Sequence, residues 1–216
     1  MQRVLVVNRK GGVGKTTIAD ELLFSLERSG IPSAYIDLDD QNSSIHADST
    51  SDSESADVVV VDTPGAFNPA VADWMRSSDI IIIPSNPSGR DIPMLMTTLE
   101  TAREVNPKAK IIIAVNRFNK FKASAEFLDA VRQIKESGED VITLPQSESF
   151  QKAYLNKRSI IIEAPKNVAA LRTLQAVNVI RRAMNLPDDP TDITEIERAL
   201  AHQQELANMR RESHNG

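Results

Sequence analysis

The sequence predicts an α/β fold, with an open and mostly parallel sheet that carries helices on both faces. Short runs that are apolar at every position alternate along the chain with longer amphipathic stretches. A continuously apolar strand is buried on both faces, as in parallel sheets that are covered by helices. The length of 216 residues, 41% of them hydrophobic, fits one medium-sized domain. The predicted strands are residues 4–7, 34–37, 58–62, 80–84, 111–115 and 141–144.

The stretches between these runs predict helices. After the first strand, Ile18, Leu22 and Leu26 recur at helical spacing, and Gly30 follows as a normal helix stop. Similar patterns predict the other helices. Together the predicted helices are residues 16–29, 70–77, 92–105, 124–136 and 168–184.

Two segments depart from this alternation. Residues 41–56 are polar and acidic and contain almost no large apolar side chain, which predicts an exposed loop. From Pro187 onward the chain is again polar, with only a thin apolar stripe. We therefore expect one domain over residues 1–186 and an acidic C-terminal helix or tail over residues 187–216.

The composition excludes several kinds of site. Without cysteine there is no disulfide framework, no thiolate zinc site, no cysteine-held iron–sulfur cluster and no cysteine nucleophile. The longest apolar runs are far shorter than the ~20 residues that a membrane-spanning helix needs. We expect a cytoplasmic protein with no segment in a membrane.

The formal net charge of −5 is distributed unevenly. Residues 37–62 contain eight acids and no lysine or arginine, and residues 186–216 contain seven acids against three arginines. Residues 103–182, in contrast, contain 15 lysines and arginines against 8 acids. The overall acidity therefore does not argue against a DNA partner for the basic part of the chain.

The strongest functional signal follows the first predicted strand, where residues 9–17 read Arg-Lys-Gly-Gly-Val-Gly-Lys-Thr-Thr. A glycine-rich turn between a strand and a helix lets backbone N–H groups approach phosphate oxygens at the positive end of the helix dipole. Lys15 would reach the terminal phosphates, and Thr16 would bind Mg²⁺. The alternative is a glycine turn followed by a solvent-exposed lysine. The predicted nucleotide-binding residues here are Lys10, Gly11, Gly12, Val13, Gly14, Lys15, Thr16 and Thr17, which makes the predicted fold P-loop NTPase-like.

Acidic residues follow the next two predicted strands. Asp37, Asp39 and Asp40 end one strand, and Asp62 ends the other. In an open parallel sheet the carboxyl ends of the strands line a common crevice, where carboxylates can hold Mg²⁺ or orient a water molecule. Aspartate is also common in ordinary turns after strands, which is the alternative explanation.

Residues 10–17 resemble the deviant Walker A motif of the ParA/MinD ATPases, whose signature is a second lysine, here Lys10. The resemblance extends over roughly residues 2–185. It implies an ATP/ADP and Mg²⁺ site that two monomers share as an ATP-dependent homodimer, with Lys10 contacting the phosphates of the opposite subunit. It also implies catalytic roles for Lys10, Lys15 and Asp39, where Asp39 orients the hydrolytic water. The implied metal-site residues are Thr16, Asp37 and Asp62.

The resemblance further implies that Asn116 contacts the adenine and that Pro145 and Gln146 belong to the loop that covers the base, although Asn116 also fits an ordinary turn. The small size favours the plasmid-partition ParA proteins. Two features depart from that group. Asp40 stands where relatives usually have proline, and only 22 residues separate Asp39 from Asp62, where relatives usually carry a further strand and helix.

The expected function is therefore a DNA-partition ATPase, nucleoid-associated, that binds nonspecific DNA as a dimer and is switched off by hydrolysis that a ParB-like partner stimulates. Membrane positioning is disfavoured because the C-terminal helix or tail, residues 187–216, is acidic. The alternatives are a ParA-like ATPase that positions a protein cargo, a dethiobiotin-synthetase-like ligase, and a scaffold that binds ATP without hydrolysing it. The candidate contacts to DNA phosphates are Lys152, Lys157, Arg158, Arg172, Arg181 and Arg182.

Overall fold

The computed structural model describes residues 1–38, 44–46, 55–192, 194, 197–198 and 201. Six strands form one sheet in the order β2-β3-β1-β4-β5-β6, and all five pairings between neighbouring strands are parallel. The six predicted strands and the parallel sheet are confirmed. The strands are β1 (Gln2–Val6), β2 (Ser33–Asp37), β3 (Val58–Asp62), β4 (Ile80–Ser85), β5 (Lys110–Phe118) and β6 (Asp140–Pro145).

The five predicted helices are confirmed to within a residue at each end. Three further elements were not predicted: a 3₁₀ turn after β4 and two short helices after β6. The helical elements are α1 (Lys15–Arg28), α2 (Pro69–Ser77), η1 (Gly89–Asp91), α3 (Ile92–Val105), α4 (Ala125–Glu136), α5 (Ser149–Leu155), α6 (Ile160–Glu163) and α7 (Val168–Ala183).

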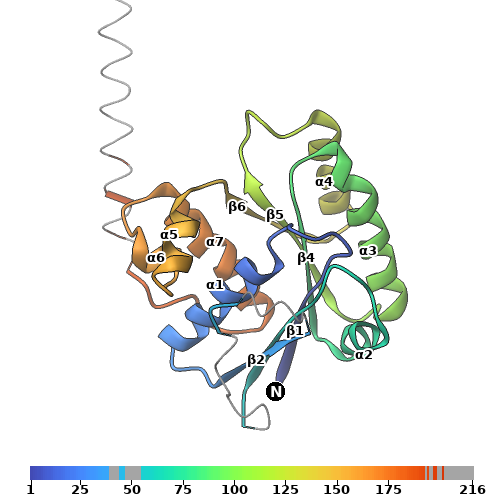
Figure 1. Ribbon diagram of the computed structural model, residues 1–216, viewed down its shortest axis with the longest axis horizontal. Coiled ribbons are helices and arrows are strands. Elements are labelled where there is room, and N and C mark those ends of the chain that lie inside the picture. The colour runs from blue at the N-terminus through green and yellow to red at the C-terminus, as the bar shows by residue number, and fades with distance from the viewer. Residues whose placement is uncertain (39–43, 47–54, 193, 195–196, 199–200, 202–216) are drawn as a thin grey trace, which may run out of the picture.

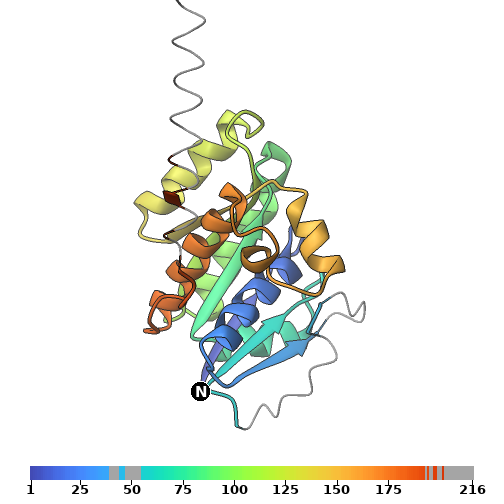
Figure 2. The same ribbon diagram turned by 90° about the vertical axis from the view of Figure 1, so that its left-hand side faces the viewer.

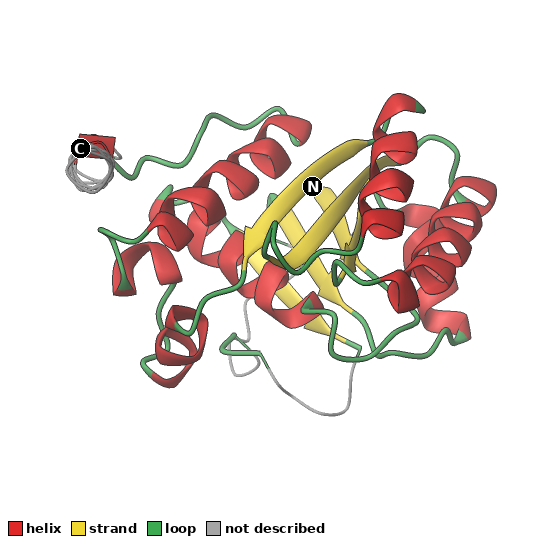
Figure 3. Cartoon of the chain, turned by 90° about the horizontal axis from the view of Figure 1, so that it is seen from above, coloured by secondary structure: helices red, strands yellow, loops and turns green. Residues whose placement is uncertain are grey.

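The sheet has an apolar core on each face, as its strand sequences require. Alternate residues of β1 point to opposite sides: Val4 and Val6 pack towards α1 and α7, whereas Leu5 packs towards α2, α3 and α4. Figures 1 and 2 show α1 and α7 over one face, with α5 and α6 beside them. Figure 3 shows the sheet between the two helical layers. This layering leaves the carboxyl ends of the strands open for a site.

Part of the predicted exposed loop is buried, which corrects that prediction. Ser44 and His46 are only 8% and 6% exposed. The Ser44 hydroxyl donates to Asp20 Oδ1 of α1 at 2.5 Å, and His46 Nδ1 lies 3.0 Å from the same oxygen. Burial lowers the pKa of His46, but hydrogen bonds to Asp20 and Glu27 outweigh burial and raise this pKa to about 9. These polar contacts, rather than an apolar pattern, attach residues 44–46 to α1.

Candidate functional site

The glycine-rich turn lies between β1 and α1, as the motif requires. Gly12 and Gly14 have φ angles of +71° and +92°, a region that favours glycine, and α1 begins at Lys15 directly after them. Lys15 is 7% exposed, and its Nζ donates to the backbone oxygen of Lys10 at 3.4 Å. Its amine therefore curls back over the turn, where a phosphate chain would lie.

Gly14 is constrained by a side chain from the other half of the sheet. A Cβ built at Gly14 would lie 1.8 Å from Asn116 Nδ2. The same amide nitrogen donates to the backbone oxygen of Val13 at 2.9 Å, and Asn116 Oδ1 accepts from the Arg117 N–H. Asn116 is thus more than a local turn residue, because it braces the glycine-rich turn from the end of β5.

Thr16 and Asp62 meet at the carboxyl end of β3. The Thr16 hydroxyl donates to Asp62 Oδ2 at 2.6 Å, and Asp37 lies opposite Asp62 in the register of β2 and β3. Burial, the largest effect, and the negative charge of Asp37 together raise the pKa of Asp62 to about 6, against the lowering effect of the Thr16 hydrogen bond.

These three side chains fit a Mg²⁺ site beside phosphates. They supply the hard oxygen ligands that Mg²⁺ prefers, and a buried carboxylate with a second one nearby is stabilised by a divalent cation. In the described residues no group of three or more His, Cys, Asp and Glu side chains suits a metal by itself. A larger cluster is not needed for Mg²⁺, which proteins usually bind with one or two carboxylates plus substrate phosphates. The predicted residues Asp39 and Asp40 lie outside the described residues.

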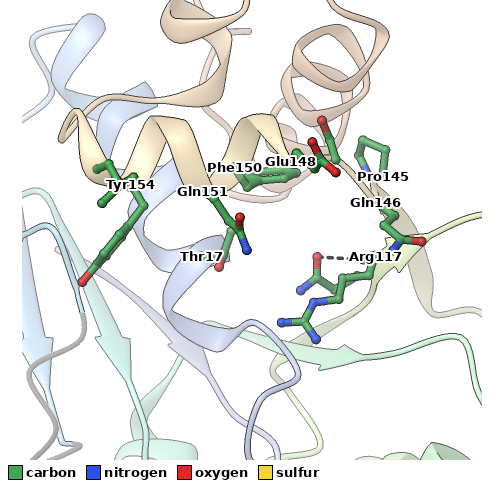
Figure 4. A pocket seen from close by; sticks show the side chains of 11 residues that line it. Thr17, Arg117, Pro145, Gln146, Glu148, Phe150, Gln151 and Tyr154 are labelled. Carbon is green, nitrogen blue, oxygen red and sulfur yellow. Dashed lines mark hydrogen bonds between the residues drawn. The ribbon is translucent and has the colours of Figure 1, made fainter.

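A cavity of about 790 Å³ opens beside the glycine-rich turn and brings together four of the residues predicted for the nucleotide. Figure 4 shows Thr17 of α1 across from Gln146, with Pro145 at the end of β6. The other predicted residue at this cavity is Asn116. The cavity therefore combines α1 with the ends of β5 and β6, as a base-binding pocket next to a phosphate site would.

Several lining residues were missed by the sequence reasoning. Arg117 adopts a φ of +51°, which is unusual for a residue with a side chain, and its guanidinium extends along the cavity (Figure 4). Helix α5 adds Phe150, Gln151 and Tyr154 to the opposite wall. The positive φ of Arg117 carries no sequence signal. Helix α5 has only seven residues, too few for a clear periodicity.

Glu21 connects α1 to the segment that contains α5 and α6, on the side of the cavity opposite Arg117. Its carboxylate accepts the Ser159 hydroxyl at 2.6 Å and the Ile160 N–H at 2.8 Å, at the start of α6. Glu21 is 4% exposed, and burial raises its pKa to about 7 although both hydrogen bonds lower it. The helix that carries Lys15 and Thr16 is thereby tied to the α5–α6 segment.

One candidate for DNA contact is corrected by the structure. Arg181 is fully buried, and its guanidinium donates to the backbone oxygens of Ser25 and Pro187, so it cannot reach a DNA phosphate. Its role is to fix the chain after α7. Arg182 is exposed and pairs with Asp188. The remaining candidates, all exposed, are Lys152, Lys157, Arg158 and Arg172.

No helix among the described residues is long and apolar enough to cross a membrane.

Comparison with known proteins identifies the family to which this site belongs. Residues 4–160 match the family described as CobQ/CobB/MinD/ParA nucleotide binding domain. Two relatives are named maintenance of carboxysome distribution protein A. The one from Halothiobacillus neapolitanus is 30% identical over 52% of this chain and 64% of its own length. The one from Gloeobacter kilaueensis is 26% identical over 70% of this chain and 76% of its own.

Solved structures share the fold at low sequence identity. The cell division protein MinD of Aquifex aeolicus matches with a TM-score of 0.68 and 17% identity over 86% of this chain and 97% of its own. An ATP complex of a Cyanothece McdA variant matches with a TM-score of 0.67 and 15% identity, over 86% of this chain and 97% of its own. A plasmid partition protein of Borrelia burgdorferi bound to AMPPNP matches with a TM-score of 0.60 and 16% identity, over 83% of this chain and 99% of its own. These matches confirm the predicted P-loop NTPase-like fold.

Proposed function

The chain belongs to the CobQ/CobB/MinD/ParA family of nucleotide-binding domains, and from this premise we propose that it is a Mg²⁺-dependent ATPase that dimerises around ATP and positions a cargo in the cell. ATPases are found among the ParA/MinD members of the family. The observation that carries the proposal is the phosphate half of the site. There Lys15 curls over the glycine-rich turn, and the Thr16 hydroxyl lies against Asp62.

In this proposal each residue acts on a defined part of the nucleotide. Lys15 binds the terminal phosphates, and Lys10 contacts the phosphates of the opposite subunit. Asp39 orients the attacking water. Thr16, Asp62 and Asp37 would hold Mg²⁺, and the bound ion would supply positive charge beside the phosphates.

A protein assembly is the favoured cargo. Both curated relatives are named for carboxysome distribution, and the cargo that their name implies is a protein body. This chain spans 64% of the length of the first relative and 76% of the second. We propose that the chain distributes a large protein assembly over the nucleoid, with a cargo-bound partner protein that stimulates hydrolysis.

DNA partition is the second candidate. The likeness to the Borrelia plasmid partition protein supports it, together with the basic character of residues 103–182. In this version the stimulating partner is a ParB-like centromere-binding protein. Nonspecific DNA binding belongs to both versions, because a positioning ATPase needs a surface to bind. The exposed Lys152, Lys157, Arg158 and Arg172 are the proposed phosphate contacts.

Nucleotide turnover and assembly test the ATPase part of the proposal. We expect Lys15→Ala to lose ATP binding, and Asp39→Ala to bind ATP and accumulate as a dimer without hydrolysis. Release of inorganic phosphate measures the turnover of ATP. Sedimentation with ADP or ATP, with and without nonspecific DNA at two salt concentrations, measures dimerisation and DNA association. A wild-type rate of hydrolysis in Asp39→Ala would refute its role. An ATP dimer that never associates with DNA at low salt would refute DNA binding.

Deletion in the source organism separates the two cargoes. If the cargo is a protein assembly, deletion leaves plasmid and chromosome inheritance intact, while a tagged assembly clusters instead of spreading along the cell. If the cargo is DNA, the deletion strain loses a plasmid or produces cells without a chromosome. Complementation with Asp39→Ala should fail in either case, which ties the phenotype to the ATP cycle.

A further inference from the structure

The amine of Lys10 is bound inside its own chain. Lys10 Nζ lies 2.9 Å from Asp91 Oδ2, in an ion pair between the glycine-rich turn and η1, the turn after β4. The Asp91 side chain is only 5% exposed, whereas that of Lys10 is 35% exposed. A buried carboxylate thus holds an amine that solvent can still reach.

The rest of Lys10 is fixed independently of this ion pair. Its N–H donates to Asn8 Oδ1 at 2.9 Å, and its backbone oxygen accepts from Lys15 Nζ. Asn8 is itself anchored, since its Nδ2 donates to the Pro84 backbone oxygen at 2.6 Å, at the end of β4. The backbone of Lys10 therefore stays in place when the amine moves, and only the side chain needs to swing.

We propose that Asp91 is a positioning residue for Lys10, which holds the amine within its own protomer until a second, ATP-loaded copy of the chain draws it away. The inference rests on the proposed function, in which Lys10 contacts phosphates of the opposite subunit. To bind the phosphates of the opposite subunit, the Lys10 amine, now 2.9 Å from Asp91, would exchange that carboxylate for the phosphates. Dimerisation therefore opens this latch, the Lys10–Asp91 ion pair, in both protomers.

Opening the latch is unfavourable because of what it leaves behind. Besides Lys10, the Asp91 carboxylate contacts the Asn86 Nδ2 group at 3.4 Å, a neutral and long hydrogen bond. A buried carboxylate that loses its cation is destabilised. The polyphosphate of a bound nucleotide carries several negative charges, so it can replace Asp91 as the partner of the Lys10 amine. The latch thus makes dimerisation depend on the bound nucleotide.

Asp91→Asn tests the latch, because it keeps the shape of the side chain and removes its charge. We expect the ATP-dependent dimer of this variant to form at a protein concentration about tenfold lower, since a charge-assisted hydrogen bond is replaced by a weaker neutral one in both protomers. Analytical ultracentrifugation at a series of concentrations measures the dissociation constant. A change that merely weakened the fold would shift the constant in the opposite direction.

A surface ion pair elsewhere in the chain supplies the matched control. Lys110 Nζ and Asp140 Oδ2 also lie 2.9 Å apart, at the amino ends of β5 and β6, far from the glycine-rich turn. Asp140→Asn should leave the dimer constant unchanged. The double variant Lys10→Ala/Asp91→Asn should dimerise like Lys10→Ala alone, because Asp91 acts only through Lys10.

Lysine acylation of the nucleotide-free protein tests the ion pair without reference to dimers. In a brief pulse followed by peptide mass spectrometry, Asp91→Asn should increase labelling of Lys10 roughly threefold or more and leave Lys110 unchanged. Asp140→Asn should increase labelling of Lys110 and leave labelling of Lys10 unchanged. Equal labelling of Lys10 in wild type and Asp91→Asn would overturn the proposal.

The two measurements separate the latch from the proposed function. If the wild type dimerises with ATP but Asp91→Asn dimerises equally or more weakly, the latch is wrong and the proposed function stands. If neither protein dimerises with ATP although both bind it, the proposed function is wrong and the latch falls with it. Tighter dimerisation of Asp91→Asn, together with faster labelling of Lys10, supports both.

Discussion

The two halves of the proposed nucleotide site, which we call the phosphate half and the base half, are built in different ways. The phosphate half consists almost entirely of consecutive residues, from Asn8 to Thr16, completed by Asp62 of the neighbouring strand. The base half is assembled from distant parts of the chain: Asn116 at the end of β5, Pro145 at the end of β6, and α5. One half is a local motif, and the other is a product of the tertiary fold.

This difference determines how each half can fail. The phosphate half depends on backbone conformation, because glycines and the start of α1 orient N–H groups towards an anion. The base half depends on packing, because its walls come from separate elements that must be held together. The halves meet at two points: Asn116 against the turn at Val13 and Gly14, and Glu21 against the start of α6. Substitutions at these junctions therefore test whether the two halves fail independently.

The largest effect is expected for Gly14→Ala. The φ of +92° costs roughly 1–3 kcal/mol for a residue with a Cβ, and that Cβ would collide with Asn116 Nδ2. The Asn116 side chain would have to move away, which breaks its hydrogen bond to the Val13 backbone oxygen. We expect ADP to bind at least about tenfold more weakly by isothermal titration calorimetry, which corresponds to a loss of roughly 1.4 kcal/mol or more.

Gly138→Ala is the matched control for this prediction. Gly138 also has a positive φ, +104°, but a Cβ there would meet nothing within 4 Å. It should lose stability through strain alone and bind ADP normally. The double variant Gly14→Ala/Asn116→Ala should recover part of the lost stability but not the affinity. If Gly14→Ala binds ADP like the wild type, the close approach of Asn116 does not matter to the site.

The same distinction explains what the sequence could predict. The strands, the parallel sheet and the glycine-rich turn are encoded by local patterns and were predicted, although β5 continues to Phe118, three residues beyond its predicted end. The burial of Arg181 was missed because two basic neighbours at the end of a helix normally indicate an exposed surface. Its burial depends on carbonyl oxygens of Ser25 and Pro187, which only the tertiary structure brings together.

The base half was predicted only where a motif reached it. The family resemblance implied that Asn116, Pro145 and Gln146 lie at the base, and these residues stand at the carboxyl ends of β5 and β6. Tyr154 could not, because α5 is short and its orientation depends on packing against neighbouring helices. Asp91 was missed for a related reason, since nothing in the sequence marks a buried carboxylate in a 3₁₀ turn.

At the second junction, the expected effect of Glu21→Gln is on the pH dependence of stability. The folded state raises the pKa of Glu21 from 4.5 to about 7, so the contribution of this carboxyl to stability is complete below pH 4.5 and is lost as the pH rises through 7. The free energy of unfolding of the wild type, relative to Glu21→Gln, should fall by about 3 kcal/mol between about pH 4.5 and 7.5. Urea denaturation at several pH values measures this difference.

Glu126→Gln gives the reference for this experiment, because Glu126 is exposed on α4. Its stability should run parallel to that of the wild type at every pH. Parallel curves for the wild type and Glu21→Gln would mean that burial does not raise the pKa of Glu21. The connection between α1 and α6 would then rest on its hydrogen bonds alone.

The smallest effect is expected for Tyr154→Ala, which alters only the base half. Tyr154 is 51% exposed and lies along the cavity wall on α5, so its removal takes away an aromatic face and little of the core. We expect roughly two- to tenfold weaker binding of ADP, the size of one aromatic contact. Binding of inorganic triphosphate with Mg²⁺ should not change, because that ligand occupies only the phosphate half.

Phe121→Ala is the control, since Phe121 is 86% exposed and lies outside the cavity. It should bind both ligands like the wild type. The ratio of ADP affinity to triphosphate affinity is therefore the decisive quantity: it falls in Tyr154→Ala and stays constant in Phe121→Ala. If Tyr154→Ala weakened both ligands equally, the wall formed by α5 would also shape the phosphate half, and the two halves would not be separable.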